Sequence, residues 1–174
     1  GVIYGAKILG TPLKQKIPGI EFAERLMEQM AAAKKSLYLL GAKPGIAEQA
    51  AARLLERYPG LIIAGTHDGY FQEDAPVIEE IHASGADVVF VCLGAPKQEL
   101  WMEKNGGATG AHLLLGLGGS LDVFAGVVQR APKIFQKTGM EWFYRLLKQP
   151  SRVGRMMRLP LFLFHAMHSK GGRR

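Results

Sequence analysis

The sequence predicts an α/β fold, a Rossmann-like parallel sheet with helices on both faces, followed by a basic amphipathic helical C-terminal appendage. Between residues 36 and 119, short apolar runs alternate four times with stretches of helical character, which is typical of a doubly wound sheet. The run Val88–Cys92 is too short for an ordinary helix and is typical of a strand buried on both faces. Beyond residue 139 the chain becomes basic and rich in Met and Phe. We therefore divide it into an α/β core, residues 1–139, and an appendage, residues 140–174.

The length and the composition of the chain fit a globular protein with its own core. The chain has 174 residues, of which 48% are hydrophobic and 21% charged, and this length suffices for a sizeable core. The single cysteine, Cys92, lies inside an apolar run, so a buried thiol is favoured over a nucleophile, and a disulfide framework within the chain is excluded. Because neither a leader peptide nor an apolar run of about 20 residues is found, we expect a cytoplasmic protein.

Glycine and proline mark the breaks between the predicted elements. Gly41 and Gly45 enclose the first loop, and residues 58–60, Tyr-Pro-Gly, end the helix that follows. Pro96 has the fixed φ that suits a first helical turn, and Ser120 is the predicted N-cap of a last short segment. Strands are expected at residues 36–40, 61–64, 87–93 and 112–117. Helices are expected at residues 20–35, 46–57, 74–83 and 96–105, with a helix-compatible opening stretch at residues 1–9.

Polar side chains follow each predicted strand. In a parallel sheet the carboxyl ends of the strands lie at one edge, where helix N-termini direct N–H donors and a positive dipole at anions. We therefore expect the side chains to converge on a ligand there, although a capped helix with a solvated first turn also explains the triplet at residues 97–99. The residues are Lys43, Thr66, His67, Asp68, Lys97, Gln98, Glu99, Ser120 and Asp122.

The net charge of +7 comes entirely from the appendage. Residues 140–174 hold eight of the 22 basic residues and one of the 15 acidic residues, which leaves 14 of each sign in residues 1–139. This asymmetry indicates an anionic partner. The apolar, Met- and Phe-rich run at residues 156–167 favours an anionic membrane interface, with a helix packed on its own domain or on a partner as the alternative. Because no nucleic-acid-binding pattern is found, nucleic acid is not expected as a partner.

No sequence pattern for a metal ion or a cofactor is found, and neither is expected. The five histidines lack the spacing of a zinc site, and residues 116–119, Gly-Leu-Gly-Gly, are only a fragment of a dinucleotide loop. Three carboxylates, Asp68, Glu99 and Asp122, could act as bases or bind sugar hydroxyls. Taken singly, each is more often a helix cap or a solvated charge.

Three arginines of the appendage, Arg145, Arg152 and Arg155, could line one side of a segment that Pro150 bends or caps. Arginines clamp diphosphates and offset charge that develops on a leaving group. A polar sheet edge combined with an arginine-rich, membrane-seeking tail therefore fits an enzyme that acts on a lipid-linked, phosphate-bearing substrate.

Seven stretches occur in one order along the chain: Leu40–Gly45 (LGAKPG), Tyr58–Leu61 (YPGL), Gly65–Phe71 (GTHDGYF), Leu93–Glu99 (LGAPKQE), Gly116–Asp122 (GLGGSLD), Arg130–Pro132 (RAP) and Gly139–Leu147 (GMEWFYRLL). Taken together, they closely resemble the WecG/TagA/CpsF family of glycosyltransferases. The resemblance implies an inverting, metal-independent transferase that moves N-acetylmannosamine, or its uronic acid, from a UDP-sugar to undecaprenyl-diphosphate-linked N-acetylglucosamine. This step belongs to wall teichoic acid or surface-polysaccharide biosynthesis.

The resemblance also implies partners and site residues. The partners are the UDP-sugar, the lipid-linked acceptor, an anionic surface on the inner face of the plasma membrane, and further copies of the chain in a homo-oligomer. The implied catalytic residues are Gln98, near the sugar or the acceptor, and Arg145, Arg152 and Arg155, which steady the diphosphate. The implied substrate-binding residues are Lys16, Thr66, Asp68, Tyr70, Gly94, Pro96, Glu99, Gly118, Gly119 and Asp122.

Two departures from the family pattern affect these expectations. Family members carry a further N-terminal segment, in which the Asp of an Asp-Gly pair is the favoured catalytic base. Gly1 matches the Gly of that pair, so we expect a fragment that binds but turns over slowly, since losing a positioned base costs about 10²–10⁴-fold in rate. Lys16 stands where the family usually has Arg and lacks its bidentate fork. The alternative functions are a non-catalytic UDP-sugar-binding or membrane-docking module and a nucleic-acid binder.

Overall fold

The computed structural model describes residues 2–15, 17–129 and the single positions 132, 135, 144 and 168. The chain divides into two compact units, of which residues 18–129 form one, the α/β core. In the other unit, helix α1 spans Val2–Ile8, and the rings of Phe135 and Tyr144 lie 5.4 Å apart. The predicted boundary between residues 139 and 140 and the predicted helical appendage fall outside the described residues, apart from those single positions.

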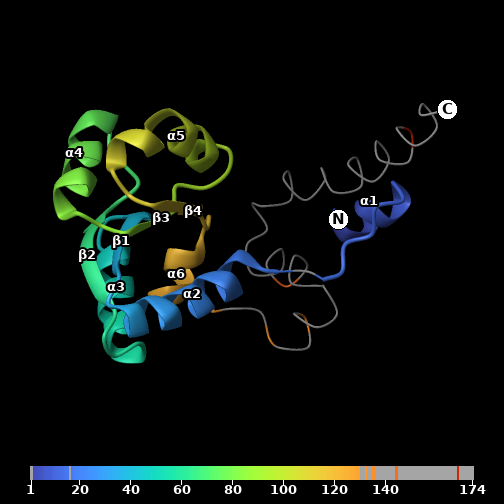
Figure 1. Ribbon diagram of the computed structural model, residues 1–174, viewed down its shortest axis with the longest axis horizontal. Helices are drawn as coiled ribbons and strands as arrows, with labels where there is room; N and C mark the ends of the chain where they lie inside the picture. The colour runs from blue at the N-terminus through green and yellow to red at the C-terminus, as the bar shows by residue number, and fades with distance from the viewer. Residues whose placement is uncertain are drawn as a thin grey trace. The chain divides into compact units, whose positions relative to one another are not determined.

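The elements of the α/β core follow the predicted order, which confirms the α/β fold class (Figure 1). The helices are α2 (Gly19–Ala33), α3 (Ile46–Arg57), α4 (Asp74–Ser84), α5 (Lys97–Asn105) and α6 (Ser120–Phe124), with a 3₁₀ turn, η1 (Gly106–Thr109), after α5. The strands are β1 (Ser36–Gly41), β2 (Ile62–His67), β3 (Val88–Cys92) and β4 (Leu113–Gly116).

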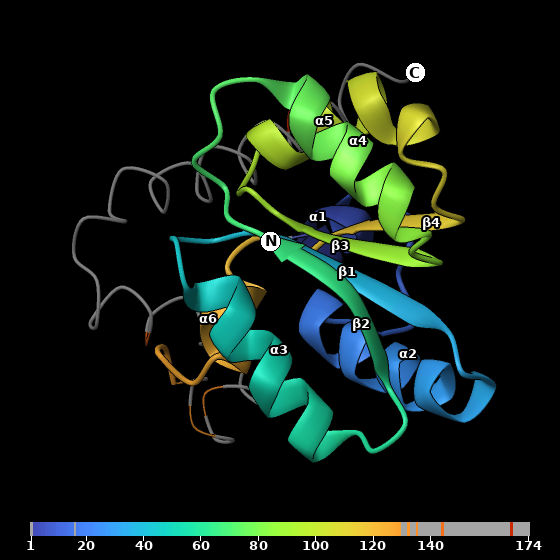
Figure 2. The ribbon, with the colours of Figure 1, turned by 90° about the vertical axis from the view of Figure 1, so that its left-hand side faces the viewer.

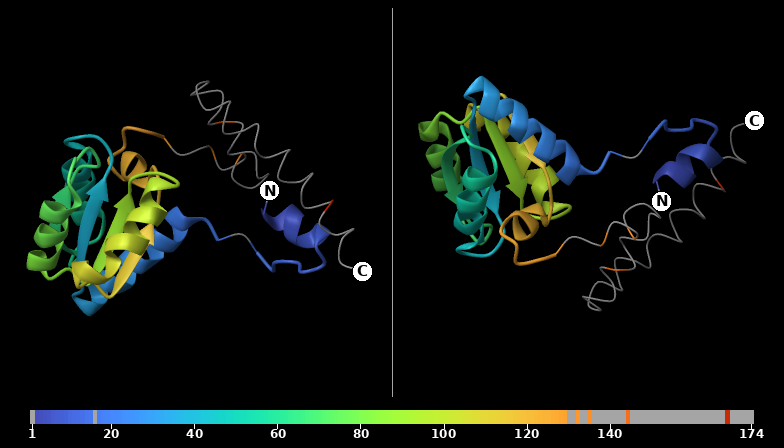
Figure 3. Two further views of the ribbon diagram at one scale, coloured as in Figure 1. Left: turned by 90° about the horizontal axis from the view of Figure 1, so that it is seen from above. Right: turned by 90° about the horizontal axis from the view of Figure 1, so that it is seen from below.

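The four strands form a parallel sheet in the order β2-β1-β3-β4, which the labels of Figure 2 show and which Figure 3 views from two further sides. The chain runs from β1 outward to β2 and then crosses back over β1 to β3. The sheet therefore has its topological switch point between β1 and β3, where the following loops leave for opposite faces. In open α/β sheets this is where ligands bind.

Helices cover both faces of this sheet (Figure 2). One apolar cluster joins α2, α3 and α6 to one face, and a second joins α4 and α5 to the other. Alternation along β1 separates the two: Leu37 and Leu39 belong to the first cluster, and Tyr38 and Leu40 to the second. The strand is hydrophobic throughout because both of its faces are covered.

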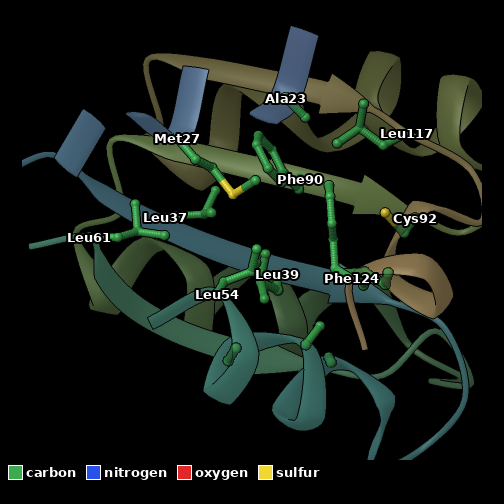
Figure 4. Packing of buried hydrophobic residues seen from close by; sticks show 14 of the residues in the cluster. Ala23, Met27, Leu37, Leu39, Leu54, Leu61, Phe90, Cys92, Leu117 and Phe124 are labelled. Carbon is green, nitrogen blue, oxygen red and sulfur yellow. The ribbon is translucent and has the colours of Figure 1, made fainter. Parts of the chain in front are cut away.

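The larger cluster contains Phe90 of β3, which is fully buried. The same layer holds Met27 of α2, Leu54 of α3 and Phe124 of α6 (Figure 4). These contacts join three helices that are far apart in the sequence to one sheet face. They fix the carboxyl ends of β1 and β3, and with them the loops that carry the site.

Strand β2 is longer than predicted. The prediction ended it at residue 64, but after a register shift between Leu37 and Tyr38 the pairing with β1 continues to His67. Gly65 lies under a ring, since a Cβ built on it would come within 2.5 Å of Cε2 of Tyr38. Gly65 suggested a turn in the sequence, but in the structure its missing side chain leaves room for the ring of Tyr38.

The start of α6 also differs from the prediction. Ser120 is its first helical residue rather than its N-cap, and Gly119 occupies the cap position. The Ser120 hydroxyl donates a hydrogen bond backward to the carbonyl of Leu117, 2.7 Å away. In the part of the chain that is described, no helix has the length and apolar character needed to cross a membrane.

Candidate functional site

A cavity of about 620 Å³ lies at the carboxyl edge of the sheet, beside the switch point between β1 and β3. Its size is that of a small-molecule or cofactor site. Four segments supply its walls: the loop after β1, the loop after β2, the end of β3 with the start of α5, and α6. The lining residues are Ala42, Lys43, Gly69, Tyr70, Phe71, Gln72, Cys92, Leu93, Lys97 and Asp122.

The β1–α3 loop is fixed against the end of β3. Gly41 has a φ of +128°, and a Cβ on it would collide with the backbone of Cys92, so only glycine fits this turn. The N–H of Ala42 donates to the carbonyl of Cys92 at 3.2 Å. The ammonium group of Lys43, the next residue, is exposed and has no hydrogen-bond or ion-pair partner among residues 2–15 and 17–129.

The loop after β2 is held by its own backbone and by Asp68. The N–H of Gly69 donates to the carbonyl of Ala42 at 2.9 Å, and a Cβ on Gly69 would lie 3.1 Å from Cδ2 of Leu93. The carboxylate of Asp68 accepts the N–H of Tyr70 at 2.7 Å, so Asp68 shapes the turn. Tyr70 thereby lies at the cavity with 64% of its surface exposed.

Lys97 connects the start of α5 to this loop. Its ammonium donates to the carbonyl of Gly69 at 3.0 Å and lies 4.8 Å from the centre of the Phe71 ring. The same ring makes edge contacts with His67 and Trp101, at centroid distances of 5.7 and 6.5 Å. Lys97 is thus a cavity residue whose charge already has partners.

Gln98 fastens the start of α5 to the loop before α6. It is 6% exposed, and its side-chain oxygen accepts the N–H of Gly118 at 2.9 Å. Its amide nitrogen donates to the carboxylate of Glu99 at 2.8 Å. Gln98 packs closely on Gly116, because a Cβ there would lie 2.8 Å from Nε2 of Gln98. Both ends of this amide are therefore engaged with the protein.

Cys92 and Asp122 line the cavity with opposite properties. Cys92 is 5% exposed, and burial raises the pKa of its thiol to about 12, with the nearby Asp122 carboxylate acting in the same direction. The Asp122 carboxylate accepts no hydrogen bond and forms no ion pair within the described part of the chain. A carboxylate with free lone pairs can accept hydroxyl donors of a ligand.

Helices α3 and α5 both begin beside the cavity, and neither has a side-chain hydrogen bond at its N-cap, Gly45 and Pro96 respectively. Unpartnered N–H groups in a first turn favour anions, but the N–H groups of Ile46 and Gln98 here donate to the carbonyls of Lys43 and Gly94. The Ala95–Pro96 peptide bond is cis. The described residues include no group of three or more His, Cys, Asp or Glu side chains arranged to hold a metal ion.

The structure brings together part of the predicted site. Of the predicted binding residues, Tyr70 and Asp122 line the cavity. Thr66 instead donates to Glu48 of α3 at 3.4 Å, and Asp68 and Gln98 hold the loops. The remaining predicted residues that are described are not among the residues that line the cavity: Gly94, Pro96, Glu99, Gly118 and Gly119. Lys16, Arg145, Arg152 and Arg155 lie outside the described residues.

Two cations of the cavity, Lys43 and Lys97, were not among the predicted binding residues. The sequence did contain a signal for them, because both follow a strand in the expected convergent set. Phe71, Gln72 and Leu93 also line the cavity. Which of several polar residues after a strand faces the cavity depends on the loop conformation, and the sequence pattern does not supply that conformation.

Comparison with known proteins gives a consistent result. A model of the family described as "Glycosyl transferase WecG/TagA/CpsF family" matches residues 1–174. A Bacillus spizizenii protein named N-acetylglucosaminyldiphosphoundecaprenol N-acetyl-beta-D-mannosaminyltransferase is 37% identical over 163 residues, or 94% of this chain and 63% of the relative. A Staphylococcus aureus (strain MRSA252) protein of the same name is 37% identical over 171 residues, 98% of this chain and 67% of the relative. The chain thus spans about two thirds of the length of these relatives.

Proposed function

The chain belongs to the WecG/TagA/CpsF family of glycosyltransferases, and on that premise we propose that it transfers N-acetylmannosamine, or its uronic acid, from a UDP-sugar. The proposed acceptor is undecaprenyl-diphosphate-linked N-acetylglucosamine, and the proposed product serves wall teichoic acid or surface-polysaccharide assembly. The names of the two relatives support this acceptor and this sugar.

The cavity at the switch point is the single observation that carries the proposal. It combines an exposed aromatic ring, Tyr70, with two cations and the Asp122 carboxylate. An aromatic ring can stack on a nucleobase, cations attract phosphate groups, and a carboxylate accepts sugar hydroxyls. These three chemistries correspond to the three parts of a nucleotide sugar.

In the proposed reaction the oxygen of an acceptor hydroxyl attacks the anomeric carbon with inversion, the bond from that carbon to the diphosphate breaks, and UDP leaves. The proton of the hydroxyl passes to a base, which the resemblance assigns to the N-terminal segment of family members. Asp122 orients the sugar through its hydroxyls, and Gln98 keeps the loop before α6 in place. Arg145, Arg152 and Arg155 are proposed to offset the charge that develops on the leaving diphosphate. The basic appendage is proposed to place the site against an anionic membrane, where the lipid-linked acceptor resides, and to influence self-association of the chain.

A transfer assay tests the proposal. The chain is incubated with UDP-N-acetylmannosamine and a short-chain lipid-diphosphate N-acetylglucosamine acceptor, and the disaccharide product is measured by mass spectrometry. Transfer that falls at least about tenfold in Asp122→Asn supports the proposal. If the chain alone is inactive, the assay is repeated with a fusion that carries the N-terminal segment of a family member. Nucleotide binding without transfer in that form would indicate a non-catalytic sugar-nucleotide-binding module instead.

A further inference from the structure

We propose that Lys43 binds the diphosphate of a nucleoside diphosphate ligand directly in the cavity beside β1 and β3. This inference rests on the proposed function, because it assigns the phosphate-binding residue within the same site. It differs from the assignment by resemblance, which gives the diphosphate to arginines of the appendage.

The two lysines of the cavity differ in what their ammonium groups contact. That of Lys97 is occupied by the carbonyl of Gly69 at 3.0 Å and by the Phe71 ring at 4.8 Å. That of Lys43 makes no such contact with any described residue, although it lines the same cavity. A ligand phosphate can therefore bind Lys43 without breaking a contact within the protein, whereas binding to Lys97 would compete with the carbonyl of Gly69.

The backbone on both sides of Lys43 is well fixed. Ala42 donates to the carbonyl of Cys92 at 3.2 Å and accepts the N–H of Gly69 at 2.9 Å. On the other side, the carbonyl of Lys43 accepts the N–H of Ile46 at 3.1 Å, at the start of α3. A flexible side chain on a fixed backbone is thus presented to the cavity, so binding requires ordering of that side chain but not of the loop.

Charge places the phosphates on the Lys43 side of the cavity. The Asp122 carboxylate, on α6, repels phosphate oxygens and suits hydroxyl groups. A lysine ammonium is a compact charge with three donors that can follow the oxygens of a diphosphate. With Tyr70 at the loop after β2, the cavity then has separate places for the base, the diphosphate and the sugar.

The test measures binding to the full 174-residue chain by calorimetry with three probes: UDP, inorganic pyrophosphate and uridine. Three variants are compared. Lys43→Met removes the charge, Lys43→Arg retains it, and Lys34→Met makes the same charge change at the end of α2, next to the amino end of β1. Circular dichroism and Tm confirm that each variant is folded. If Lys43 had only a structural role, its replacement by Met would weaken the binding of all three probes alike. If Lys43 binds phosphate, the same replacement leaves the binding of uridine unchanged.

The proposal predicts that Lys43→Met weakens the binding of UDP and of pyrophosphate by about tenfold or more, which is the effect of losing a charge-assisted hydrogen bond. It also predicts that uridine binding is unchanged, that Lys43→Arg restores most of the affinity, and that Lys34→Met matches the wild type. Binding of UDP to the wild type should weaken with salt, and this dependence should be smaller in Lys43→Met.

The outcomes separate the two proposals. If UDP binds and Lys43→Met binds it as well as Lys34→Met does, the role of Lys43 is overturned and the nucleotide site stands. If pyrophosphate binds through Lys43 but UDP binds no better than pyrophosphate, Lys43 does bind phosphate, and the proposal that the donor is a nucleotide sugar is overturned. If the wild type binds neither UDP nor pyrophosphate, both are overturned.

Discussion

The side-chain oxygen of Gln98 accepts the backbone N–H of Gly118 at 2.9 Å, which joins the first turn of α5 to the loop before α6, twenty residues later in the sequence. The first turn of α5 lies beside the cavity, and the loop that contains Gly118 leads to α6 and Asp122. The side-chain amide of Gln98 is buried, and its nitrogen donates a second hydrogen bond, to the carboxylate of Glu99 at 2.8 Å. The site therefore depends on Gln98 whether or not Gln98 contacts a ligand.

Replacing Gln98 by Ala should lower the free energy of unfolding by about 1–3 kcal/mol, because the N–H of Gly118 loses its partner in a part-buried position. Gln98→Glu should lower the free energy of unfolding less at acidic pH than at neutral pH, because at neutral pH the new carboxylate would be repelled by the carboxylate of Glu99. Urea unfolding monitored by circular dichroism measures both. The matched control is Gln49→Ala on the exposed side of α3; an equal effect there would contradict this account.

Lys97→Met should loosen the loop after β2, because the contacts with Gly69 and the Phe71 ring are lost. Hydrogen exchange of residues 69–72 should become faster, and UDP binding should weaken several-fold as Tyr70 loses its position. Lys104→Met, which removes an exposed ion pair with Asp74 elsewhere on α5, is the control. Unchanged exchange at residues 69–72 would show that Lys97 does not hold the loop.

Asp87 should make stability sensitive to acid. The N–H of Ser36 and the ammonium of Lys35 donate to its carboxylate and lower its pKa to about 2. A carboxyl group with a lower pKa in the folded state stabilises the fold above its unfolded pKa of about 3.9, and this stabilisation is lost as the pH falls through 4 toward 2. Asp87→Asn should therefore destabilise the protein at pH 7 and show a weaker loss of stability in that window.

Denaturation curves at a series of pH values measure the effect of Asp87. Glu103→Gln, at an exposed carboxylate on α5, is the control for a change in net charge. If Asp87→Asn and the wild type lose stability in parallel from pH 4 to 2, the hydrogen bonds of Asp87 do not stabilise the fold.

The thiol of Cys92 should react slowly in the folded protein. It is 5% exposed, and burial raises its pKa to about 12, so little thiolate forms at pH 8. Reaction with a disulfide reagent such as DTNB should be much slower in buffer than in guanidinium chloride. Rapid stoichiometric reaction of the folded protein would mean that the end of β3 is open to solvent.

The sequence predicted the fold well because its signals were local. The run Val88–Cys92 is uniformly apolar and proved to be buried along its whole length, and the helix at residues 46–57 was predicted at its observed bounds. The convergence of polar residues at one sheet edge followed from parallel topology alone, and Lys43, Lys97 and Asp122 do share one cavity.

The rest of the site depended on contacts that a sequence pattern does not contain. Gly65 suggested a turn, but it continues β2 because it packs under the ring of Tyr38. Asp68 was predicted to bind substrate, and the structure shows its carboxylate bonded to the N–H of Tyr70. Such bonds decide which polar groups are left for a ligand, and they become visible only when the loops are placed in space.

The central claim is that a nucleotide sugar binds at the carboxyl edge of the sheet, and NMR mapping with UDP tests it most directly. Backbone amide shifts recorded during titration of the labelled chain should change at residues 42–43, 69–72, 92–95, 97 and 122. Amides at the amino edge, around Lys35 and Asp87, should not move. Shifts confined to the amino edge, or no saturable shifts at millimolar UDP, would contradict the claim.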